Sequence, residues 1–273
     1  MNSVIRWAGS KRKLLPKISA YWDESCLRYV EPFAGSAALF FHVKPKFAIL
    51  NDNNSELIHA YKQLQEVPSL IYKKLSEYPK SQEFYYELRA QDAKMLDDVT
   101  RAARFFYLNR YCFNGIYRVN AHGKFNVPYA KSKTGNFPAL ETWLEAALQL
   151  KKAEFSSLDF ENFLLRTVKK GDFVYLDPPY AVSNRRVFSQ YSLDSFGLND
   201  MDRLAKTLEI IDARGARFVV SYALSPEGRS LTGNWHVQRA RIQRNVAGFQ
   251  KHRRIAIEVL ISNHEPRKGG SDV

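Results

Sequence analysis

Short apolar runs that alternate with stretches of helical spacing constrain the fold of this chain more than any other feature. Residues 28–33 and 46–52 form two such runs, and residues 35–43 and 54–64 have helical periodicity. The alternation returns with strand-like runs at residues 153–157, 172–180, 216–222 and 254–263, and with a helical stretch at residues 198–215. This order predicts an α/β fold with a parallel sheet whose ligands bind at the carboxyl ends of the strands.

The alternation pauses between residues 67 and 150. This part of the chain has mainly helical spacing, most clearly at residues 101–113. An aromatic and Asn/Gly-rich stretch, "FNGIYRVNAHGKFNVPY", indicates a hairpin or structured loop at residues 113–129. A chain of 273 residues that is 45% hydrophobic can hold one large domain with an insertion. We therefore expect residues 1–66 and 151–273 to form one sheet domain and residues 67–150 to form an inserted, mainly helical subdomain.

The chain is strongly basic. Its 41 Lys and Arg residues against 28 Asp and Glu residues give a net charge of +13, which favours a polyanionic partner, first of all nucleic acid. A basic protein with a solvated surface is the alternative that charge alone leaves open. Cys26 and Cys112 lie far apart, without the spacing of a metal site, so we expect no metal and a reducing compartment. No signal-peptide core or membrane span is visible, and we expect a cytoplasmic protein.

The run "FVYLDPPYA" ends on polar and rigid residues where a strand should end. Asp177 would lie at the rim of the sheet, and Pro178 and Pro179 would hold the chain stiff while leaving the Pro178 carbonyl free to accept a hydrogen bond. Two acceptors suit a group with two N–H hydrogens, and Tyr180 offers a face on which a ring can stack. These residues predict a binding site for a planar amine such as adenine. A Pro-rich turn with a surface tyrosine is the alternative.

A glycine-containing turn, "EPFAGSA", lies between the first expected strand and its helix. Gly35 would let the backbone approach a ligand closely, and the start of the helix would favour a carboxylate. An ordinary strand–helix turn is the alternative.

Two further segments carry polar groups near the expected ligand. Asp52, at the end of the next strand, is placed to bind ribose hydroxyls, and its neighbour Asn53 is a candidate helix cap. In "WAGSK", Trp7 is an unusual residue for a polar N-terminal segment, and Lys11 could neutralise a ligand carboxylate. A solvated basic segment with one packed tryptophan is the alternative.

Five segments in this order resemble the Dam-type DNA adenine methyltransferases of the D12 class. They are "IRWAGSKRKLLPKI", "EPFAGSAALFF", "NDNNSELI", "YLNRYCFNGIYRVNAHGKFNVPY" and "VYLDPPY", and the resemblance continues more weakly through "IAIEVLISN". It implies a Rossmann-like methyltransferase sheet, S-adenosylmethionine as cofactor, and the 6-amino group of a flipped-out adenine in double-stranded DNA as acceptor. One departure is Ala37, where many members carry a second glycine.

The resemblance also implies roles for individual residues. The acceptor site would consist of Asp177, Pro178, Pro179 and Tyr180. The cofactor site would consist of Trp7, Ala8, Gly9, Lys11, Glu31, Pro32, Phe33, Gly35, Asp52, Asp159, Phe160 and Asp177. Hydrogen bonds from both amine hydrogens to Asp177 and the Pro178 carbonyl would localise the nitrogen lone pair for in-line attack. Neither cysteine follows a proline, which disfavours a cytosine-5 methyltransferase.

The inserted region is the expected DNA reader. Arginine and asparagine side chains suit base edges, and the aromatic residues among them suit stacking at a disrupted step. A solvated hairpin with a packed aromatic face is the alternative. The predicted DNA-binding residues are Arg6, Arg110, Phe113, Asn114, Ile116, Arg118, Asn120 and Pro128. By resemblance, Arg118 and Arg6 would each read a guanine, Ile116 and Pro128 would contact thymine methyls, Phe113 would intercalate, and Asn114 would contact a phosphate. The basic stretches "RARIQRN" and "KHRR", at residues 239–245 and 251–254, are expected to contact phosphate.

The target sequence and the biological setting follow less directly. GATC or a related site is expected, although Ser132 stands where relatives that methylate GATC carry a tyrosine. We expect a monomer in solution, associated with the nucleoid; whether it acts with a nuclease in restriction-modification stays open. Three alternatives are an RNA base-amine methyltransferase, a non-catalytic DNA-binding protein with the same fold, and a small-molecule methyltransferase.

Overall fold

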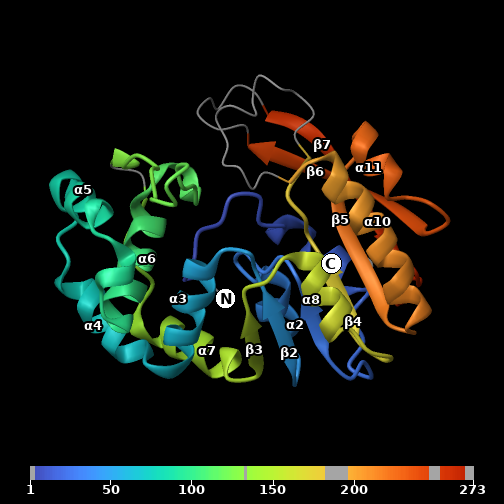
Figure 1. The fold of residues 1–273 in the computed structure, drawn as a ribbon, viewed down its shortest axis with the longest axis horizontal. Helices are drawn as coiled ribbons and strands as arrows, with labels where there is room; N and C mark the ends of the chain where they lie inside the picture. The colour runs from blue at the N-terminus through green and yellow to red at the C-terminus, as the bar shows by residue number, and fades with distance from the viewer. Residues whose placement is uncertain (1–3, 132–133, 182–195, 246–252, 268–273) are drawn as a thin grey trace. The chain divides into compact units, whose positions relative to one another are not determined.

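The computed structural model describes residues 4–131, 134–181, 196–245 and 253–267 (Figure 1). Contacts divide the chain into two compact units. The first comprises Met1–Ser10 and Asn54–Ser157, and the second comprises Lys11–Asn53 and Leu158–Val273. The division expected from the sequence, with residues 1–66 and 151–273 in a catalytic domain and residues 67–150 in an inserted recognition subdomain, stays a prediction.

One mixed sheet contains every strand in the described part of the chain. The strands are β1 (Tyr29–Glu31), β2 (Ala48–Asn51), β3 (Ala153–Ser156), β4 (Phe173–Leu176), β5 (Arg217–Ala223), β6 (His236–Asn245) and β7 (Arg253–Ser262). Their order is β3-β2-β1-β4-β5-β7-β6. The pairs β1–β2, β1–β4 and β4–β5 are parallel, and β7 is antiparallel to both β5 and β6. The strand order places β1 and β4 at the centre.

Both faces of the central strands are covered. Val30, Val174 and Phe218 lie in one row of the register and face α8 (Phe160–Thr167) and α10 (Leu198–Ala213), which supply Phe163 and Leu204 to the same apolar core. Alternate strand residues point to the other face, where the rings of Tyr29 and Phe173 pack against Trp22. Strands that are buried on both faces read as continuous apolar runs, which explains sequences such as "FVYL".

Short helices complete the second unit. They are η1 (Arg12–Leu14), α1 (Leu15–Ser19), α2 (Ala38–Val43) and α11 (Pro226–Ser230). The residue before α2, Ala37, has φ 48° and ψ 39°, a left-handed conformation that glycine adopts more easily. Ala37 is fully buried, and it holds a backbone conformation that favours glycine.

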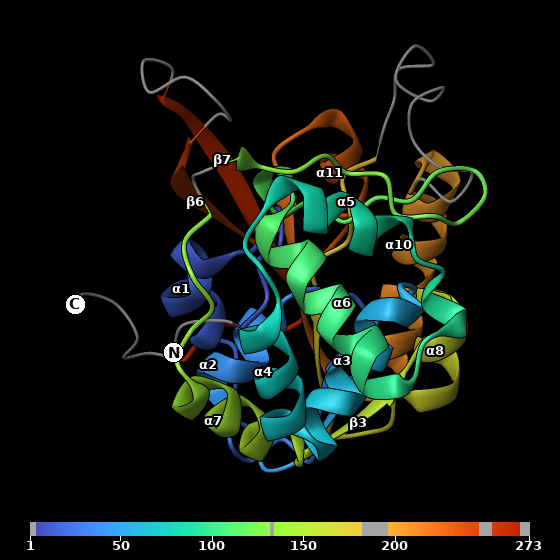
Figure 2. The same cartoon turned by 90° about the vertical axis from the view of Figure 1, so that its left-hand side faces the viewer.

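Helices dominate the first unit (Figure 2). They are α3 (Ser55–Glu66), α4 (Pro68–Glu77), α5 (Gln82–Ala90), η2 (Ala93–Met95), α6 (Asp98–Tyr111), η3 (Phe113–Gly115) and α7 (Leu140–Leu150). Most of α6 is buried, and it contacts α3, α4 and α5. The buried ring of Trp143 on α7 packs edge-on against Phe106 of α6 at 4.9 Å.

The sequence predictions hold for the α/β class, for the parallel strands around β1 and β4 and for the helices at α3, α6 and α10. The expected hairpin is present as antiparallel bridges between Val119 and Phe125 and between Cys112 and Tyr129. One cap prediction is wrong: α3 is capped by the side chain of Asn54, which accepts from two backbone amides, and Asn53 precedes it. Strand β6 was not predicted, because exposed arginines occupy its sequence.

Candidate active site and nucleic-acid interface

Strand β4 carries Asp177 to the carboxyl end of the sheet. All residues of β4 are buried, and the polar segment begins at the next residue. Asp177 is half-buried, Pro178 is buried, and Pro179 and Tyr180 are exposed. The predicted acceptor residues therefore follow a central strand at the edge of the sheet where α/β proteins bind ligands.

Asp177 is fixed by two neighbours through the same oxygen. Its Oδ1 lies 2.6 Å from Nζ of Lys11 and accepts a hydrogen bond of 3.1 Å from Oγ of Ser221, which in turn lies 3.0 Å from the Tyr175 hydroxyl. Lys11 is buried. The sequence analysis predicted that Lys11 could neutralise a ligand carboxylate. In the structure, Lys11 pairs with the carboxylate of Asp177.

Burial and charge act on both partners of this pair. Burial raises the pKa of Asp177 above its usual value, and the charge of Lys11 and the hydrogen bonds from Lys11 and Ser221 oppose that rise. Burial disfavours the ammonium of Lys11, but the neighbouring groups Asp177, Tyr180 and Glu258 outweigh it and raise the pKa of Lys11. Lys11 is consequently a buried ammonium ion that stays charged at neutral pH.

The ring of Tyr180 is held by β5 and β7. Its hydroxyl donates to Oε1 of the buried Glu258 at 2.8 Å, and its ring packs edge-on against Tyr222 with centroids 5.2 Å apart. The backbone amide of Ala181 donates to the Tyr222 hydroxyl at 2.7 Å. Nζ of Lys11 lies 5.3 Å from the centroid of the Tyr180 ring. Of the side chains that set the orientation of Tyr180, Lys11 was singled out in the sequence, whereas Tyr222 and Glu258 were not.

A second group of predicted residues surrounds the turn after β1. Gly35 has φ 47°, and its amide donates to Oδ2 of Asp52 at 2.9 Å. This hydrogen bond orients the Asp52 carboxylate, which lies just beyond the end of β2. Glu31 is buried and accepts a hydrogen bond of 2.8 Å from the Tyr29 hydroxyl. Burial raises the pKa of Glu31 well above its usual range, and the nearby charges of Asp177 and Asp52 act in the same direction.

Asn51 joins the turns of this region. Its Nδ2 donates to the carbonyls of Pro32 at 3.0 Å and Leu158 at 2.9 Å, its Oδ1 accepts from the Leu158 amide, and its own carbonyl accepts from Ala34. Asn51 is fully buried. It thereby ties the turn that follows β1 to the segment that leads into Asp159.

Asp159 and Phe160 begin α8 beside Phe33. Asp159 caps the helix by accepting from two backbone amides, and it pairs with Arg203. Arg203 also pairs with Glu161 and Asp200 at 2.8 Å, and its guanidinium lies 4.8 Å from the centroid of the Phe160 ring. Phe33 and Phe160 have centroids 5.4 Å apart. Phe33, Asp159 and Phe160 were predicted from the sequence, whereas Arg203, which lies 44 residues beyond Asp159 on α10, was not.

The N-terminal segment divides between the two units. Lys11 belongs to the second unit, whereas Trp7, Ala8 and Gly9 belong to the first. The Trp7 ring stacks on the ring of Tyr117, with centroids 6.3 Å apart and an interplanar angle of 16°. Ala8 and Gly9 are exposed. The cofactor role of these three residues stays a prediction.

The expected DNA reader is a loop that follows α6. Nε of Arg118 donates to Oδ1 of Asn126 at 2.8 Å across the hairpin. The side chain of Asn120 accepts from the amides of His122 and Lys124 and so closes the turn. Asn120 therefore has a structural use, in addition to any contact with a base.

The remaining predicted DNA contacts lie before and after this hairpin. Phe113 is half exposed, at 50%, and Asn114 is exposed with φ 55°. Ile116 is half-buried and Pro128 is exposed, and the Pro128 carbonyl accepts from the Phe113 amide at 2.9 Å. The guanidinium of Arg110 lies 5.6 Å from the Phe137 ring. Ser132 and Lys251 lie outside the described residues.

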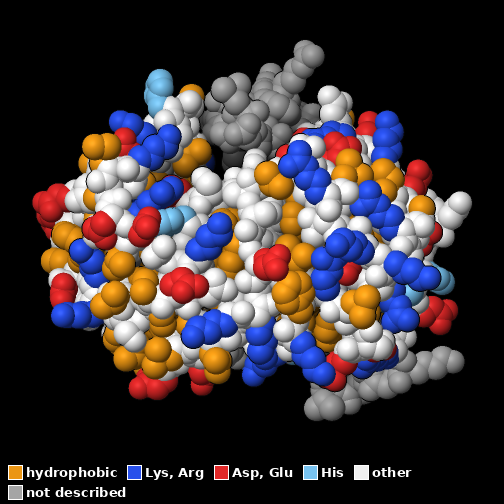
Figure 3. Space-filling view, turned by 60° about the horizontal axis from the view of Figure 1, so that its bottom comes forward, with side chains coloured by type: hydrophobic (Ala, Val, Ile, Leu, Met, Phe, Trp, Pro, Cys, Tyr) orange, Lys and Arg blue, Asp and Glu red, His pale blue; other side chains and the backbone are white. Residues whose placement is uncertain are grey.

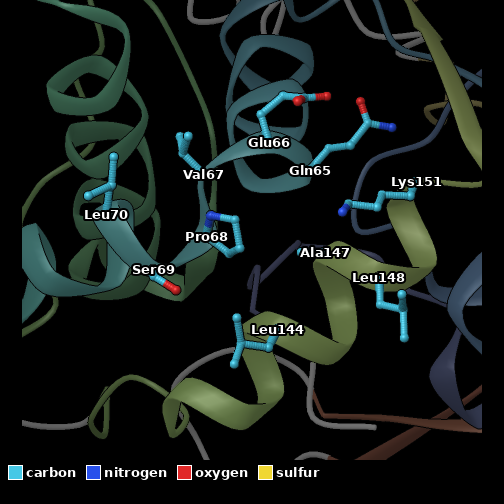
Figure 4. A pocket seen from close by; sticks show the side chains of 10 residues that line it. All are labelled: Gln65, Glu66, Val67, Pro68, Ser69, Leu70, Leu144, Ala147, Leu148 and Lys151. Atoms are coloured by element: carbon cyan, nitrogen blue, oxygen red, sulfur yellow. The ribbon is translucent and has the colours of Figure 1, made fainter.

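Charge, cavities and metal ligands add few constraints. The face in Figure 3 shows basic side chains interspersed with acidic and apolar ones. A hollow of about 520 Å³ lies between the junction of α3 and α4 and helix α7, lined in part by Leu70, Leu144 and Leu148, and it contains none of the predicted site residues (Figure 4). In the described ranges, no cluster of side chains could hold a metal ion, and no helix is long and apolar enough to cross a membrane.

Comparison with known proteins identifies the family. A type II methyltransferase from Lactococcus lactis subsp. cremoris is 33% identical over 273 residues, covering 97% of this chain and 96% of the relative. A DNA N-6-adenine-methyltransferase of Escherichia phage P1 is 36% identical over 268 residues, and this chain spans about a third of it, 35%. A DNA adenine methylase of Salmonella typhi is 31% identical over 248 residues, covering 86% of this chain and 84% of the relative.

The solved structures are more distant. An S-adenosylmethionine-dependent O-methyltransferase from Thermotoga maritima, for example, aligns at 9% identity with a TM-score of 0.36, over 95% of this chain and 67% of that one. The family model for the D12 class N6 adenine-specific DNA methyltransferases matches residues 7–246. The chain belongs to this family and is an adenine-specific DNA methyltransferase.

Proposed function

We propose that this enzyme transfers a methyl group from S-adenosylmethionine to the exocyclic amine of a flipped-out adenine in double-stranded DNA, at GATC or a related site. The observation that carries the proposal is a pair of hydrogen-bond acceptors after β4. Lys11 and Ser221 both contact Oδ1 of Asp177. No residue that the structure describes donates a hydrogen bond to Oδ2 of Asp177 or to the Pro178 carbonyl.

Two acceptors on a rigid segment match the two hydrogens of an amine. When the Asp177 carboxylate and the Pro178 carbonyl accept these hydrogens, the nitrogen lone pair is drawn out of conjugation with the adenine ring and points toward the methyl donor. Tyr180 has an exposed ring of fixed orientation that can stack on the base. Positioning of this kind supplies up to roughly 7–11 kcal/mol of a reaction barrier in favourable cases.

The second unit also fits the expected methyl donor. S-adenosylmethionine, when bound, supplies an electrophilic methyl group on a sulfonium. The Asp52 carboxylate, oriented by the Gly35 amide beyond the end of β2, suits ribose hydroxyls. The adjacent rings of Phe33 and Phe160 suit an adenine ring. The Asp159 carboxylate already caps α8 and pairs with Arg203, so we assign it mainly to holding Phe160 in place.

A base inside a duplex cannot reach Asp177, so flipping of the target adenine is part of the proposal. We assign sequence reading to the first unit, with Arg118 and Arg6 as guanine readers, Ile116 and Pro128 as thymine-methyl contacts, and Phe113 as the intercalating residue. The half-exposed Phe113 ring and the fixed Nε of Arg118 support these assignments. We further propose a monomer without a metal ion. A nuclease partner is suggested by the type II relatives.

The test measures transfer of labelled methyl groups to short duplexes. The purified enzyme is incubated with methyl-labelled S-adenosylmethionine and with duplexes that contain GATC, each single-base variant of GATC, or no adenine, and in parallel with RNA of the same sequence. We expect label in N6-methyladenine of GATC duplexes and little in RNA. Transfer to RNA alone would contradict the proposed substrate, and equal transfer to all variants would contradict the proposed site.

Matched variants separate chemistry from binding. Asp177→Asn should lose transfer and keep affinity for S-adenosylmethionine, whereas Ser76→Ala, an exposed serine on α4, should leave both unchanged. Flipping is measured by replacing the target adenine with 2-aminopurine, whose fluorescence rises when it leaves the stack. A signal that does not change on binding would exclude flipping as a stable feature of the complex.

A further inference from the structure

The backbone of Arg6 is held by one buried side chain of α6. The Arg6 amide donates to Oδ1 of Asn109 at 2.8 Å, and Nδ2 of Asn109 donates back to the Arg6 carbonyl at 2.6 Å. Asn109 is only 2% exposed. The side-chain amide of Asn109 therefore pairs with both the backbone N–H and the backbone C=O of Arg6, as a neighbouring β-strand would.

Gly115 constrains the same residue from another side. It has φ +64°, and a Cβ built on it would lie 2.9 Å from the Cβ of Arg6 and 3.4 Å from its carbonyl oxygen. Real side chains do not approach this closely, so Arg6 can occupy its position only because residue 115 has no side chain. The next residue, Trp7, stacks on Tyr117. The backbone at Arg6 is thus located by three independent contacts within the first unit.

The side chain of Arg6 is only partly used. Its Nη1 donates to the Arg110 carbonyl at 2.6 Å, in the last turn of α6, where carbonyls lack helical partners. In residues 4–131, 134–181, 196–245 and 253–267, Nε and Nη2 of Arg6 donate no hydrogen bond. These two nitrogens form the planar edge with which arginine makes bidentate contacts to guanine O6 and N7.

We propose that Asn109 is a positioning residue for sequence recognition. It holds the Arg6 backbone, and the absence of a side chain at Gly115 leaves space for that backbone. The Nε and Nη2 edge of the Arg6 guanidinium is thereby placed to contact one base pair. A bidentate contact depends on direction as well as distance, and a backbone held through both its N–H and its C=O fixes the point from which the Arg6 side chain extends toward the base. This inference rests on the proposed role of Arg6 as a guanine reader.

The test is a double-mutant cycle read out as sequence discrimination. The ratio of kcat/KM between the best duplex and each single-base variant is measured for wild type, Arg6→Ala, Asn109→Ala and the double variant. Arg6→Ala should lose about 5- to 150-fold of discrimination at one base pair, the range expected for a bidentate arginine–guanine contact. Asn109→Ala should lose discrimination at the same base pair and should have no further effect once Arg6 is alanine.

Two more variants separate positioning from general damage to the fold. Tyr107→Phe removes another hydrogen bond of α6, a partly buried one from the Tyr107 hydroxyl to the Pro79 carbonyl, without touching Arg6. It should leave every discrimination ratio unchanged. Asn109→Asp keeps the acceptor for the Arg6 amide and loses the donor to the Arg6 carbonyl. It should therefore lose less discrimination than Asn109→Ala. If the alanine variant does not fold, Asn109→Asp takes its place in the cycle.

The outcomes distinguish this inference from the role on which it rests. If Arg6→Ala changes no discrimination ratio, Arg6 is not a base reader, and both statements fall. If Arg6→Ala has the expected effect but neither Asn109 variant alters that base pair, Arg6 reads the base and the positioning role of Asn109 is overturned. An equal loss at all base pairs in the Asn109 variants would likewise overturn it, because a structural defect has no preference for one position.

Discussion

Replacing Asp177 by alanine should destabilise the free enzyme as well as stop the reaction. The side chain of Lys11 is 7% exposed and that of Asp177 is 20% exposed, and their charged atoms lie 2.6 Å apart. Removing one partner of a buried ion pair costs about 3–5 kcal/mol, because the other charge is left without compensation. Glu258 also favours the Lys11 charge, and Asp177 is partly exposed, so we expect a loss of about 3 kcal/mol.

Three further variants show whether the pair causes this loss: Lys11→Met alone, Lys11→Met with Asp177→Ala, and Asp177→Asn. Lys11→Met with Asp177→Ala removes both charges, and we expect the double variant to be about 2 kcal/mol more stable than the sum of the two single losses predicts, a coupling within the range for residues in direct contact. Asp177→Asn keeps an oxygen for Lys11 and Ser221 and should cost less, about 1–2 kcal/mol.

Urea unfolding near neutral pH, without cofactor or DNA, measures these free energies. It is repeated at low and high salt, since a buried pair is screened much less than a surface pair. A coupling free energy below about 0.5 kcal/mol, the deviation found between sites that do not interact, would refute this reasoning. In that case Lys11 would be stabilised by other neighbours, and its contact with Asp177 would contribute little to the fold.

Four other substitutions test separate parts of the enzyme. Arg118→Ala should cost about 1–3 kcal/mol of discrimination at one guanine in competition binding, and an equal loss on all sequences would make Arg118 a phosphate contact. Asp52→Ala should weaken S-adenosylmethionine binding in calorimetry with little effect on DNA affinity; unchanged cofactor affinity would reject its role. Arg203→Lys should loosen Phe160 and raise the KM for S-adenosylmethionine while kcat stays the same, and a fall in kcat alone would contradict a positioning role. Relative to wild type at the same pH, Glu31→Gln should become progressively more stable as pH rises above about 4. Folding raises the pKa of Glu31, so folded wild-type enzyme keeps a proton that the unfolded state has lost, and wild type loses stability as pH rises. Urea midpoints that differ equally from wild type at all pH values would contradict this.

The sequence predicted the scaffold because its signals are local. Buried strands such as "FVYL" are continuous apolar runs, and a polar segment directly after such a run lies at the edge of the sheet. The positions of Asp177, Asp52 and Gly35 at this edge of the sheet could therefore be predicted from the sequence. The cap of α3 was displaced by one residue because consecutive asparagines offer equally good caps, and only the turn that follows β2 decides between Asn53 and Asn54.

The partners of these residues could not be predicted in the same way. Ser221 lies on β5, which is adjacent to β4 in the sheet, and Glu258 lies on β7, the strand beyond β5. Both are distant from Asp177 in the chain, so no sequence spacing predicts their contacts. Glu258 left one usable signal, since a glutamate inside the apolar alternation "IAIEVL" must either point to solvent or find a buried partner. The pairing of Asn109 with Arg6 spans more than a hundred residues and had no signal of its own.

The arginines of β6 have a consequence for the behaviour of the protein in solution. Among the described residues, strand β6 is the last strand of the sheet on its side, and it pairs only with β7. An outer strand presents backbone groups on which another chain can add a strand, the first step of many aggregation reactions. Arg239 and Arg241 are exposed on this strand, and charge of one sign repels an identical copy. The same residues that concealed β6 in the sequence thus keep the open border of the sheet from serving as a template for self-association.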